Sequence, residues 1–100
     1  MFGLIGKMRA QPGKREELIS AIGASTDAMP GCKGYVIAED LADPDSIWIT
    51  ELWDDEASHK ASLQLPEVKA AIAKARPLIA GFDMHVTTRP VAGLTSRPAS

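Results

Sequence analysis

The sequence predicts an α+β fold in which helices cover one face of a single antiparallel sheet. Apolar segments typical of strands alternate with segments that have apolar residues at helical spacing, in the order β-α-β-β-α-β. A short run rich in Asp and Pro separates the second strand from the third, as in a hairpin. The commonest packing for this order is the ferredoxin-like arrangement, a four-stranded antiparallel sheet with its helices on one side.

Length and composition indicate one ordinary globular domain. The chain has 100 residues, of which 45% are hydrophobic and 24% charged. A net charge of −2 without a basic cluster argues against nucleic acid or an anionic membrane as a partner. The longest apolar runs fall short of the roughly 18 residues of a membrane span, and Met1–Ile5 is too short for a signal peptide. With one cysteine, Cys32, and no internal disulfide, we expect a soluble cytoplasmic protein.

The first third of the chain is expected to form a strand and a helix. An apolar segment ending in charge predicts a strand at Phe2–Arg9, and Gln11-Pro12-Gly13 predicts a turn. A helix is expected from Lys14 to about Met29, because acids occupy its first turn and Pro30-Gly31 ends it. Its apolar residues share one face: Leu18, Ile19, Ile22 and Met29.

A hairpin and a second helix are expected next. The predicted strands are Tyr35–Leu41 and Ile47–Trp53, joined by a turn at Asp43–Ser46. Neither alternate set of side chains in Ile47–Trp53 is wholly polar, which predicts burial on both faces. The acidic run Asp54-Asp55-Glu56 favours the start of a helix, which we expect to reach about Leu65.

The last third is expected to supply a further helix and a fourth strand. Pro66 fits the first turn of the helix, and Pro77 should kink or end it before Gly81. Its apolar face would hold Val68, Ile72, Ala75 and Ile79. The strand is expected at Phe82–Arg89, with Phe82, Met84 and Val86 on one side and Asp83, His85, Thr87 and Arg89 on the other. The domain would then span residues 1–90, and residues 91–100 would form a loose tail.

The predicted sheet has a second face that no helix of this chain covers. Val36, Trp48 and Leu52 alternate along their strands so as to make that face apolar. Because an apolar sheet face is unfavourable in water, we expect a homodimer formed sheet to sheet.

Most of the chemically versatile side chains surround one strand-to-helix corner, within Ile47–Ser62. This segment contains both tryptophans, Glu51 and His59, with His59 about one and a half turns into the helix. Each also has a structural interpretation that remains open. Trp53 could be core, His59 could be a solvated surface residue, and Glu51 could pair with a helix cation such as Arg76.

Side chains elsewhere favour structural roles, and other site classes are not indicated. Trp48 is expected to fill the sheet-to-sheet interior, Cys32 to pack, and His85 to lie at the surface or in the dimer. No GxGxxG, P-loop or GxSxG motif is present, and two histidines are too few for a typical metal cluster. We therefore expect neither a cofactor nor a metal.

Four short motifs resemble the antibiotic biosynthesis monooxygenase domain family, which includes quinol monooxygenases and haem-degrading relatives. They are Arg9-x-x-Pro12-Gly13-Lys14, Pro30-Gly31-Cys32-x-Gly34-Tyr35, Glu51-x-Trp53 and Leu65-Pro66-x-Val68-Lys69-Ala70, in the family's order and spacing. The resemblance implies a dimeric α+β barrel, with a pocket in each subunit between the sheet and the helices. It also implies oxygenation of a small aromatic substrate by O2 without metal or flavin. Such chemistry requires a phenol, anthrone or quinol to be deprotonated to an electron-rich anion in a dry site.

Carried over by position, the resemblance gives a mixed active site. Trp53 matches a pocket Trp of the polyketide-oxidising members, and His59 falls where they have a Tyr that contacts the substrate. An imidazole there could act as a base near neutral pH. Ile49 stands where those enzymes carry an oxyanion-binding Asn, no Asn occurs in this chain, and Ala38 replaces a pocket His.

The haem-degrading relatives are matched less well. Their Asn, Trp and His fall here on Gly6, Ser62 and Ile72, which argues against haem degradation. Ser62 also replaces a His that is frequent in the quinol-oxidising branch. The candidate site is therefore His59 as the catalytic base, with Trp53, Glu51, Ile49 and Ile72 around the substrate.

Two functions remain open. One is a cofactor-independent monooxygenase acting on a phenolic or quinol-like molecule, which the corner containing Trp53 and His59 favours. The other is a non-catalytic or isomerase-like stress protein that binds a small molecule in the same pocket, which the missing Asn favours.

Overall fold

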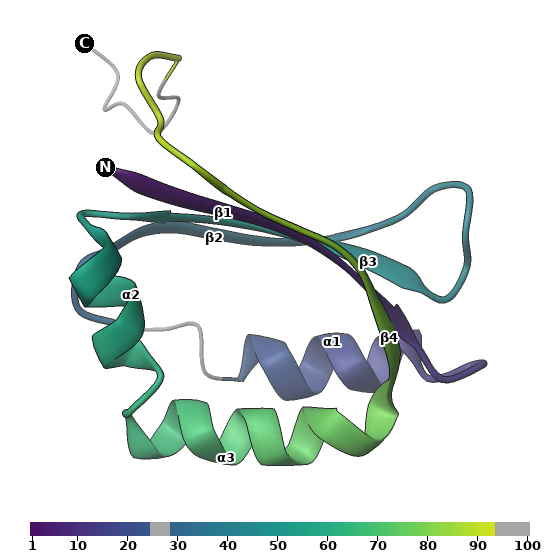
Figure 1. Cartoon of the computed structure of the whole chain (residues 1–100). Helices are drawn as coiled ribbons and strands as arrows, with labels where there is room; N and C mark the ends of the chain where they lie inside the picture. The colour runs from purple at the N-terminus through teal and green to yellow at the C-terminus, as the bar shows by residue number, and fades with distance from the viewer. Residues whose placement is uncertain (25–28, 94–100) are drawn as a thin grey trace, which may run out of the picture.

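The structure is a computed structural model that describes residues 1–24 and 29–93. It confirms the α+β, ferredoxin-like arrangement, with four antiparallel strands in the order β2-β3-β1-β4 (Figure 1). The elements in chain order are β1 (Phe2–Ala10), α1 (Arg15–Gly23), β2 (Cys32–Glu39), β3 (Ser46–Trp53), α2 (Glu56–Ser62), α3 (Pro66–Ala75), the 3₁₀ turn η1 (Arg76–Leu78) and β4 (Ile79–Thr88).

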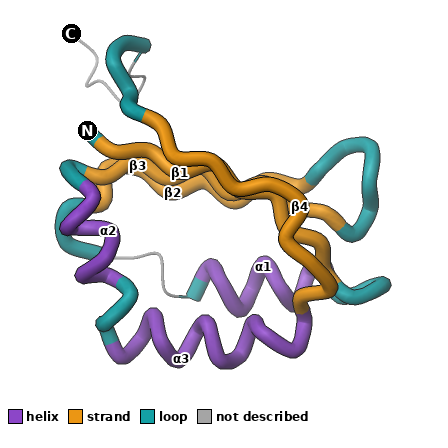
Figure 2. The backbone as a smooth tube through the Cα atoms, in the orientation of Figure 1, coloured by secondary structure: helices purple, strands orange, loops and turns teal. Residues whose placement is uncertain are grey.

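All three α-helices lie on one side of the sheet, so the molecule has two layers (Figure 2). Between the layers are two clusters of buried side chains. Leu18 of α1 and Ile47 of β3 are fully buried in the first. The second surrounds Trp53 near α2 and the start of α3, and includes Leu4 and Val68. The helices thus cover one buried cluster at each end of the sheet.

The register of β3 shows which side chains face the helices. Residues paired across antiparallel strands point to the same face, and β3 pairs with both β1 and β2. Ile47, Ile49 and Trp53 are buried on the helix side. The expectation that both faces of this strand are buried is wrong for the single chain. On the other face Thr50 is exposed, and Trp48 is only half-buried, because no helix covers it.

The first strand of the hairpin begins and ends earlier than expected, whereas the second ends at Trp53 as expected. Strand β2 spans Cys32–Glu39 rather than Tyr35–Leu41, and Leu41 is fully exposed. The reason is Asp40, whose Oδ1 accepts hydrogen bonds from the backbone N–H groups of Ala42 (2.7 Å) and Asp43 (2.9 Å). This side chain takes over backbone donors and turns the chain out of the strand.

Two helices are shorter than expected. Helix α1 ends at Gly23 instead of near Met29, which lies in the loop before β2 and is buried there. Part of the expected helix, residues 25–28, lies outside the described residues, as do residues 94–100 of the expected tail. Helix α2 ends at Ser62 instead of Leu65. The next three residues make backbone hydrogen bonds to carbonyls three positions earlier, and a new helix then begins at Pro66.

Strand β4 contains a bulge that changes which way its side chains point. Lys7 pairs with Met84 but Met8 pairs with Phe82, so Asp83 is an extra residue. Phe82 therefore shares the helix-side face with Met8, whereas Met84 shares the open face with Lys7. The expectation that Phe82 and Met84 lie on one side is wrong. Pro77 acts as expected, since α3 gives way to the 3₁₀ turn around it.

Candidate active site

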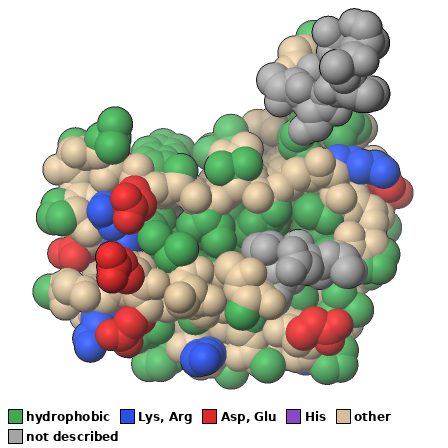
Figure 3. All heavy atoms as spheres, turned by 180° about the vertical axis from the view of Figure 1, so that it is seen from behind, with side chains coloured by type: hydrophobic (Ala, Val, Ile, Leu, Met, Phe, Trp, Pro, Cys, Tyr) green, Lys and Arg blue, Asp and Glu red, His purple; other side chains and the backbone are tan. Residues whose placement is uncertain are grey.

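A pocket of about 690 Å³ lies between the helix-facing side of the sheet and the helices. From the side opposite to Figure 1, apolar side chains fill a hollow between these two layers (Figure 3). A volume of this size suits a small organic ligand. The lining is mostly aliphatic, and its polar members are Tyr35, Glu51, Trp53, His59, Ser62 and Arg76.

Three of these polar side chains form a cluster at one end of the pocket. Glu51 Oε1 accepts a hydrogen bond from the indole Nε1 of Trp53 at 3.0 Å and lies 4.0 Å from His59 Nε2. The imidazole meets the Trp53 ring edge to face, with 5.4 Å between ring centroids. The side chains of His59 and Glu51 are only 20% and 17% exposed. His59 is therefore not a solvated surface residue, and Glu51 pairs with Trp53 and His59 rather than with Arg76.

The corner that holds His59 is fixed by a cap and a close backbone contact. Asp55 is the N-cap of α2, and its Oδ1 accepts a hydrogen bond from the Ser58 backbone N–H at 2.7 Å. The Asp54 N–H donates to Gly31 O at 2.8 Å, which ties this corner to the turn before β2. Gly31 has φ +79°, and a Cβ there would lie 2.6 Å from the side chain of Ser58. Only glycine fits there without displacing α2.

Burial raises the pKa of Glu51, although the Trp53 N–H and the nearby His59 and His85 each act to lower it. The carboxylate is thus desolvated beside an imidazole. The distance of 4.0 Å between Glu51 Oε1 and His59 Nε2 is too long for a hydrogen bond, but short enough for the carboxylate to attract a positive charge on the ring. The pair can accept a proton from a ligand that enters the pocket.

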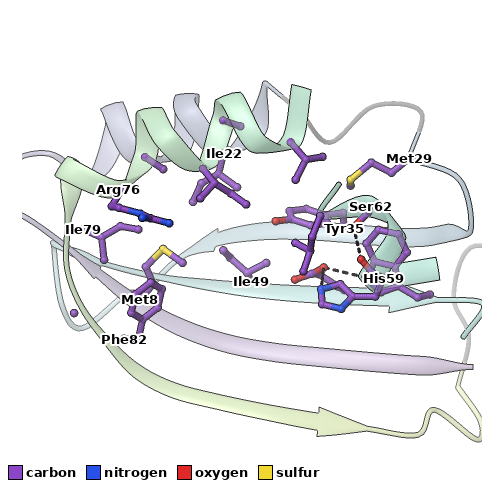
Figure 4. Close-up of a pocket in the computed structure, with 18 of the residues that line it drawn as sticks. Met8, Ile22, Met29, Tyr35, Ile49, His59, Ser62, Arg76, Ile79 and Phe82 are labelled. Carbon is purple, nitrogen blue, oxygen red and sulfur yellow. Dashed lines mark hydrogen bonds and ion pairs between the residues drawn. The ribbon is translucent and has the colours of Figure 1, made fainter. Parts of the chain in front are cut away.

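Tyr35 is a polar site residue that the sequence analysis missed. It lies opposite Glu51 in the β2–β3 register, and its side chain lines the pocket, with the hydroxyl directed toward the interior (Figure 4). Burial, and after it the negative charge of Glu51, raises the pKa of Tyr35 above its usual range. Its hydroxyl therefore remains a hydrogen-bond donor at physiological pH. The hairpin turn could have revealed it, since pairing outward from Asp43 brings Tyr35 to Glu51.

The other predicted site residues have different places. Ile49 is buried at the pocket floor, and Ile72 lines the helix side with 39% of its surface exposed. The Ser62 hydroxyl donates to the backbone oxygen of His59 at 2.6 Å and so helps to end α2. His85 is exposed and does not belong to the lining.

Cys32 and Trp48 do not line the pocket. Cys32 packs against the cluster around Trp53, and burial raises the pKa of its thiol, as befits a packing role. Trp48 lies on the opposite face of the sheet, where its Nε1 donates to Asp40 Oδ2 at 2.7 Å.

Further apolar lining residues come from several elements that only the fold brings together. They include Met8, Ile22, Met29 and Phe82 (Figure 4). In the described part of the chain, no three His, Cys, Asp or Glu side chains converge to hold a metal ion. Within the same residues, no helix is long and apolar enough to cross a membrane.

Comparisons with known proteins agree with this architecture. The family model for the antibiotic biosynthesis monooxygenase matches residues 1–74. A crystal structure of a "putative Antibiotic biosynthesis monooxygenase" from Chloroflexus aurantiacus is 57% identical, with a TM-score of 0.92 over 94% of this chain and 96% of that one. No curated protein matches the chain at a significant level.

More distant structures share the fold alone. A protein from Deinococcus radiodurans is 24% identical over 98% of this chain and 100% of its own, with a TM-score of 0.76. Another from Nitrosomonas europaea is 14% identical over 92% of this chain and 100% of its own, with a TM-score of 0.82. The family match and the 57% identity are decisive: the chain belongs to the antibiotic biosynthesis monooxygenase family.

Proposed function

We propose that this protein is a cofactor-independent monooxygenase that oxidises a phenolic or quinol-like small molecule with O2. The observation that supports it best is the largely buried pair of Glu51 and His59 at the end of an apolar pocket. Family membership supports the same reaction class.

In the proposed reaction, His59 takes a proton from the substrate. Glu51, desolvated at 4.0 Å from the ring, stabilises the imidazolium that forms. Trp53, buried to 1% exposure, forms a rigid wall against which an aromatic ring can pack. The apolar lining excludes water, so that the substrate anion stays electron-rich.

The substrate anion then supplies every electron that oxygen needs. For a ring CH₂ group, the anion gives one electron to O2, and the resulting radical and superoxide combine to form a C–O bond. The peroxide takes up the proton held by His59. Loss of the second C–H proton with cleavage of the O–O bond yields a C=O group and one water. The carbon loses four electrons and O2 gains four, with one oxygen atom in each product.

Tyr35 is the donor that we assign to the developing negative charge. The chain has no Asn, and Ile49 offers no hydrogen bond. The Tyr35 hydroxyl lies across the hairpin from Glu51, points into the pocket and stays protonated. A neutral donor held in a dry site stabilises an oxyanion more strongly than water does.

Ile49 also favours a second candidate, in which the pocket binds a small molecule without oxygenating it. An apolar side chain at the pocket floor, in a chain without Asn, suits simple binding. A Glu–His pair can also move a proton between two carbon atoms, which is isomerase chemistry. A stress protein of either kind would use the same residues and consume no O2.

Oxygen uptake with dihydroxyanthracenone and naphthoquinol substrates, without added cofactor, separates these candidates. We expect turnover by the parent protein, and His59→Ala should slow it by about 10²–10⁴-fold, the usual contribution of a general acid or base. Lys60→Ala is the matched control, because Lys60 is exposed on the same helix and outside the lining, and its rate should equal that of the parent. An unchanged rate in His59→Ala contradicts the mechanism. No uptake with any of these substrates favours the second candidate.

We also infer a homodimer that forms through the open faces of two sheets. Val36 is 58% exposed, Met84 43% and Val86 41%, and these apolar side chains share a face with Trp48. A second copy of the same face would cover them. A cytoplasmic location remains a prediction from composition.

A further inference from the structure

The pocket has a second polar end, formed by one residue. Arg76 lies opposite the end that contains His59 and Tyr35, and its guanidinium extends toward the interior (Figure 4). Its neighbours in the lining are apolar, among them Met8 and Phe82. The pocket therefore has an acid–base cluster at one end, an aliphatic middle and a cation at the other end.

Arg76 has no anionic partner among the residues that the structure describes. Glu51, which supplies the carboxylate among the described lining residues, is engaged by Trp53 and His59. Asp83 is close in sequence to this end but pairs with Arg9 at 3.4 Å on the other side of the sheet. No hydrogen bond or ion pair of the Arg76 side chain is found within residues 1–24 and 29–93.

The position of Arg76 is set by the way α3 ends. It is the C-cap of α3 and the first residue of η1, directly before Pro77. Pro77 prevents the helix from continuing, and β4 starts at Ile79 and runs along β1. Both sides of Arg76 are thus anchored, by a helix and by the sheet, so its backbone is fixed at the pocket wall.

We propose that the Arg76 end of the pocket binds the carboxylate of an aromatic ligand whose hydroxyl-bearing ring lies at the Glu51–His59 end. A guanidinium matches a carboxylate with two parallel N–H···O hydrogen bonds, and because Arg76 is exposed, solvent screens part of the attraction. The preferred substrate class is accordingly a hydroxylated aromatic acid, which should bind more tightly than a neutral quinol. The placement of the hydroxyl rests on the proposed function, whereas the carboxylate site rests on Arg76 alone.

Binding of three ligands in the absence of O2 tests this proposal. They are 6-hydroxy-2-naphthoate, its neutral amide and 2-naphthol, each titrated calorimetrically against the parent protein. The carboxylate should bind about tenfold more tightly than the amide, as expected for a partly exposed charge-assisted pair. Arg76→Gln should remove this preference and leave amide binding unchanged, while Arg76→Lys should keep part of it. Lys74→Gln, on an exposed position of the same helix, is the matched control.

Several outcomes would overturn the carboxylate site. They are equal affinities for carboxylate and amide, no binding of the carboxylate, and a preference that survives Arg76→Gln. The first two need only the parent protein, so an unfolded variant cannot obscure the result. Because these titrations contain no O2, a protein that discriminates the carboxylate but never consumes O2 supports this inference and contradicts the monooxygenase. A protein that oxidises neutral quinols but binds the carboxylate no more tightly than the amide supports the monooxygenase and contradicts the carboxylate site.

Discussion

Glu51 is the residue on which most of the site's electrostatics depend. It is largely removed from water, and within residues 1–24 and 29–93 it accepts one side-chain hydrogen bond, from the Trp53 N–H. Desolvation outweighs this bond, so its pKa is raised. A carboxyl group whose pKa rises on folding binds its proton more tightly in the native state than in the unfolded chain. The stability it confers is therefore present below the unfolded pKa and is lost as pH rises through the folded pKa.

Glu51→Gln should remove this loss of stability with rising pH. The amide oxygen can still accept from Trp53, but it never becomes charged. Urea unfolding of both proteins at intervals between pH 4 and 7.5 should show the variant gaining stability relative to the parent as pH rises. Oxygen uptake should fall, since the imidazole of His59 loses the charge that stabilises its protonated form. A stability difference that does not vary with pH would mean that Glu51 is not desolvated as described.

At the residue scale, the sequence indicated that Glu51, Trp53 and His59 lie together, as they do in the structure, but it did not indicate every residue of the pocket. Glu51, Trp53 and His59 were predictable because they lie within nine positions of one another at a single corner. Arg76 and Phe82 were not, since their places depend on how α3 ends and on a bulge opposite Lys7 and Met8. A bulge inverts the alternation of side chains, and period-two reasoning has no means of locating it.

At the scale of elements, α2 carries His59 and is the shortest of the α-helices that the structure describes. Seven residues are too few to form an isolated helix in water. The helix depends on the Asp55 cap and on the contact of Gly31 with Ser58. The Ser58 backbone N–H lowers the pKa of Asp55, so the cap stabilises the fold above the unfolded pKa and is lost as pH falls through the lowered value.

Asp55→Ala should loosen α2 and with it the position of His59. We expect a lower midpoint of urea unfolding at pH 7 and slower oxygen uptake, with both effects small in Asp55→Asn, which keeps a capping oxygen. Asp54→Ala is the matched control. Its side chain makes an exposed ion pair with Lys33, and its backbone bond to Gly31 survives the substitution. Equal effects in Asp54→Ala and Asp55→Ala would argue against a specific role for the cap.

Element order and type were predictable from the sequence, and boundaries were less so. The spacing of apolar residues and the positions of the prolines predicted the four strands and the start of α3. The end of β2 was misjudged because Asp40 turns the chain through its own side chain, although Leu41 continues an apolar pattern. Local side-chain hydrogen bonds of this kind compete with strand pairing and leave little trace in hydrophobic periodicity.

At the scale of the whole molecule, the two faces of the sheet differ in what covers them. The helix-facing side forms the pocket, and the open side presents apolar residues without a cover. The prediction that Val36, Trp48 and Leu52 share one face is confirmed by the register of β2 and β3. The dimer itself stays a prediction, because it concerns a second chain.

Val36→Lys should prevent dimerisation while leaving the single chain folded. Val36 is 58% exposed in one chain, so a lysine there is tolerated by the monomer. In a sheet-to-sheet dimer the same charge would be buried without a partner, at a cost of several kcal/mol. Light scattering at micromolar concentration should give twice 10.7 kDa for the parent and 10.7 kDa for the variant. Leu41→Lys, at a fully exposed position off the sheet, should remain a dimer.

A monomeric parent, or a dimeric Val36→Lys, would contradict the sheet-to-sheet interface. Because the pocket lies on the other face of the sheet, the monomeric variant should still bind 2-naphthol.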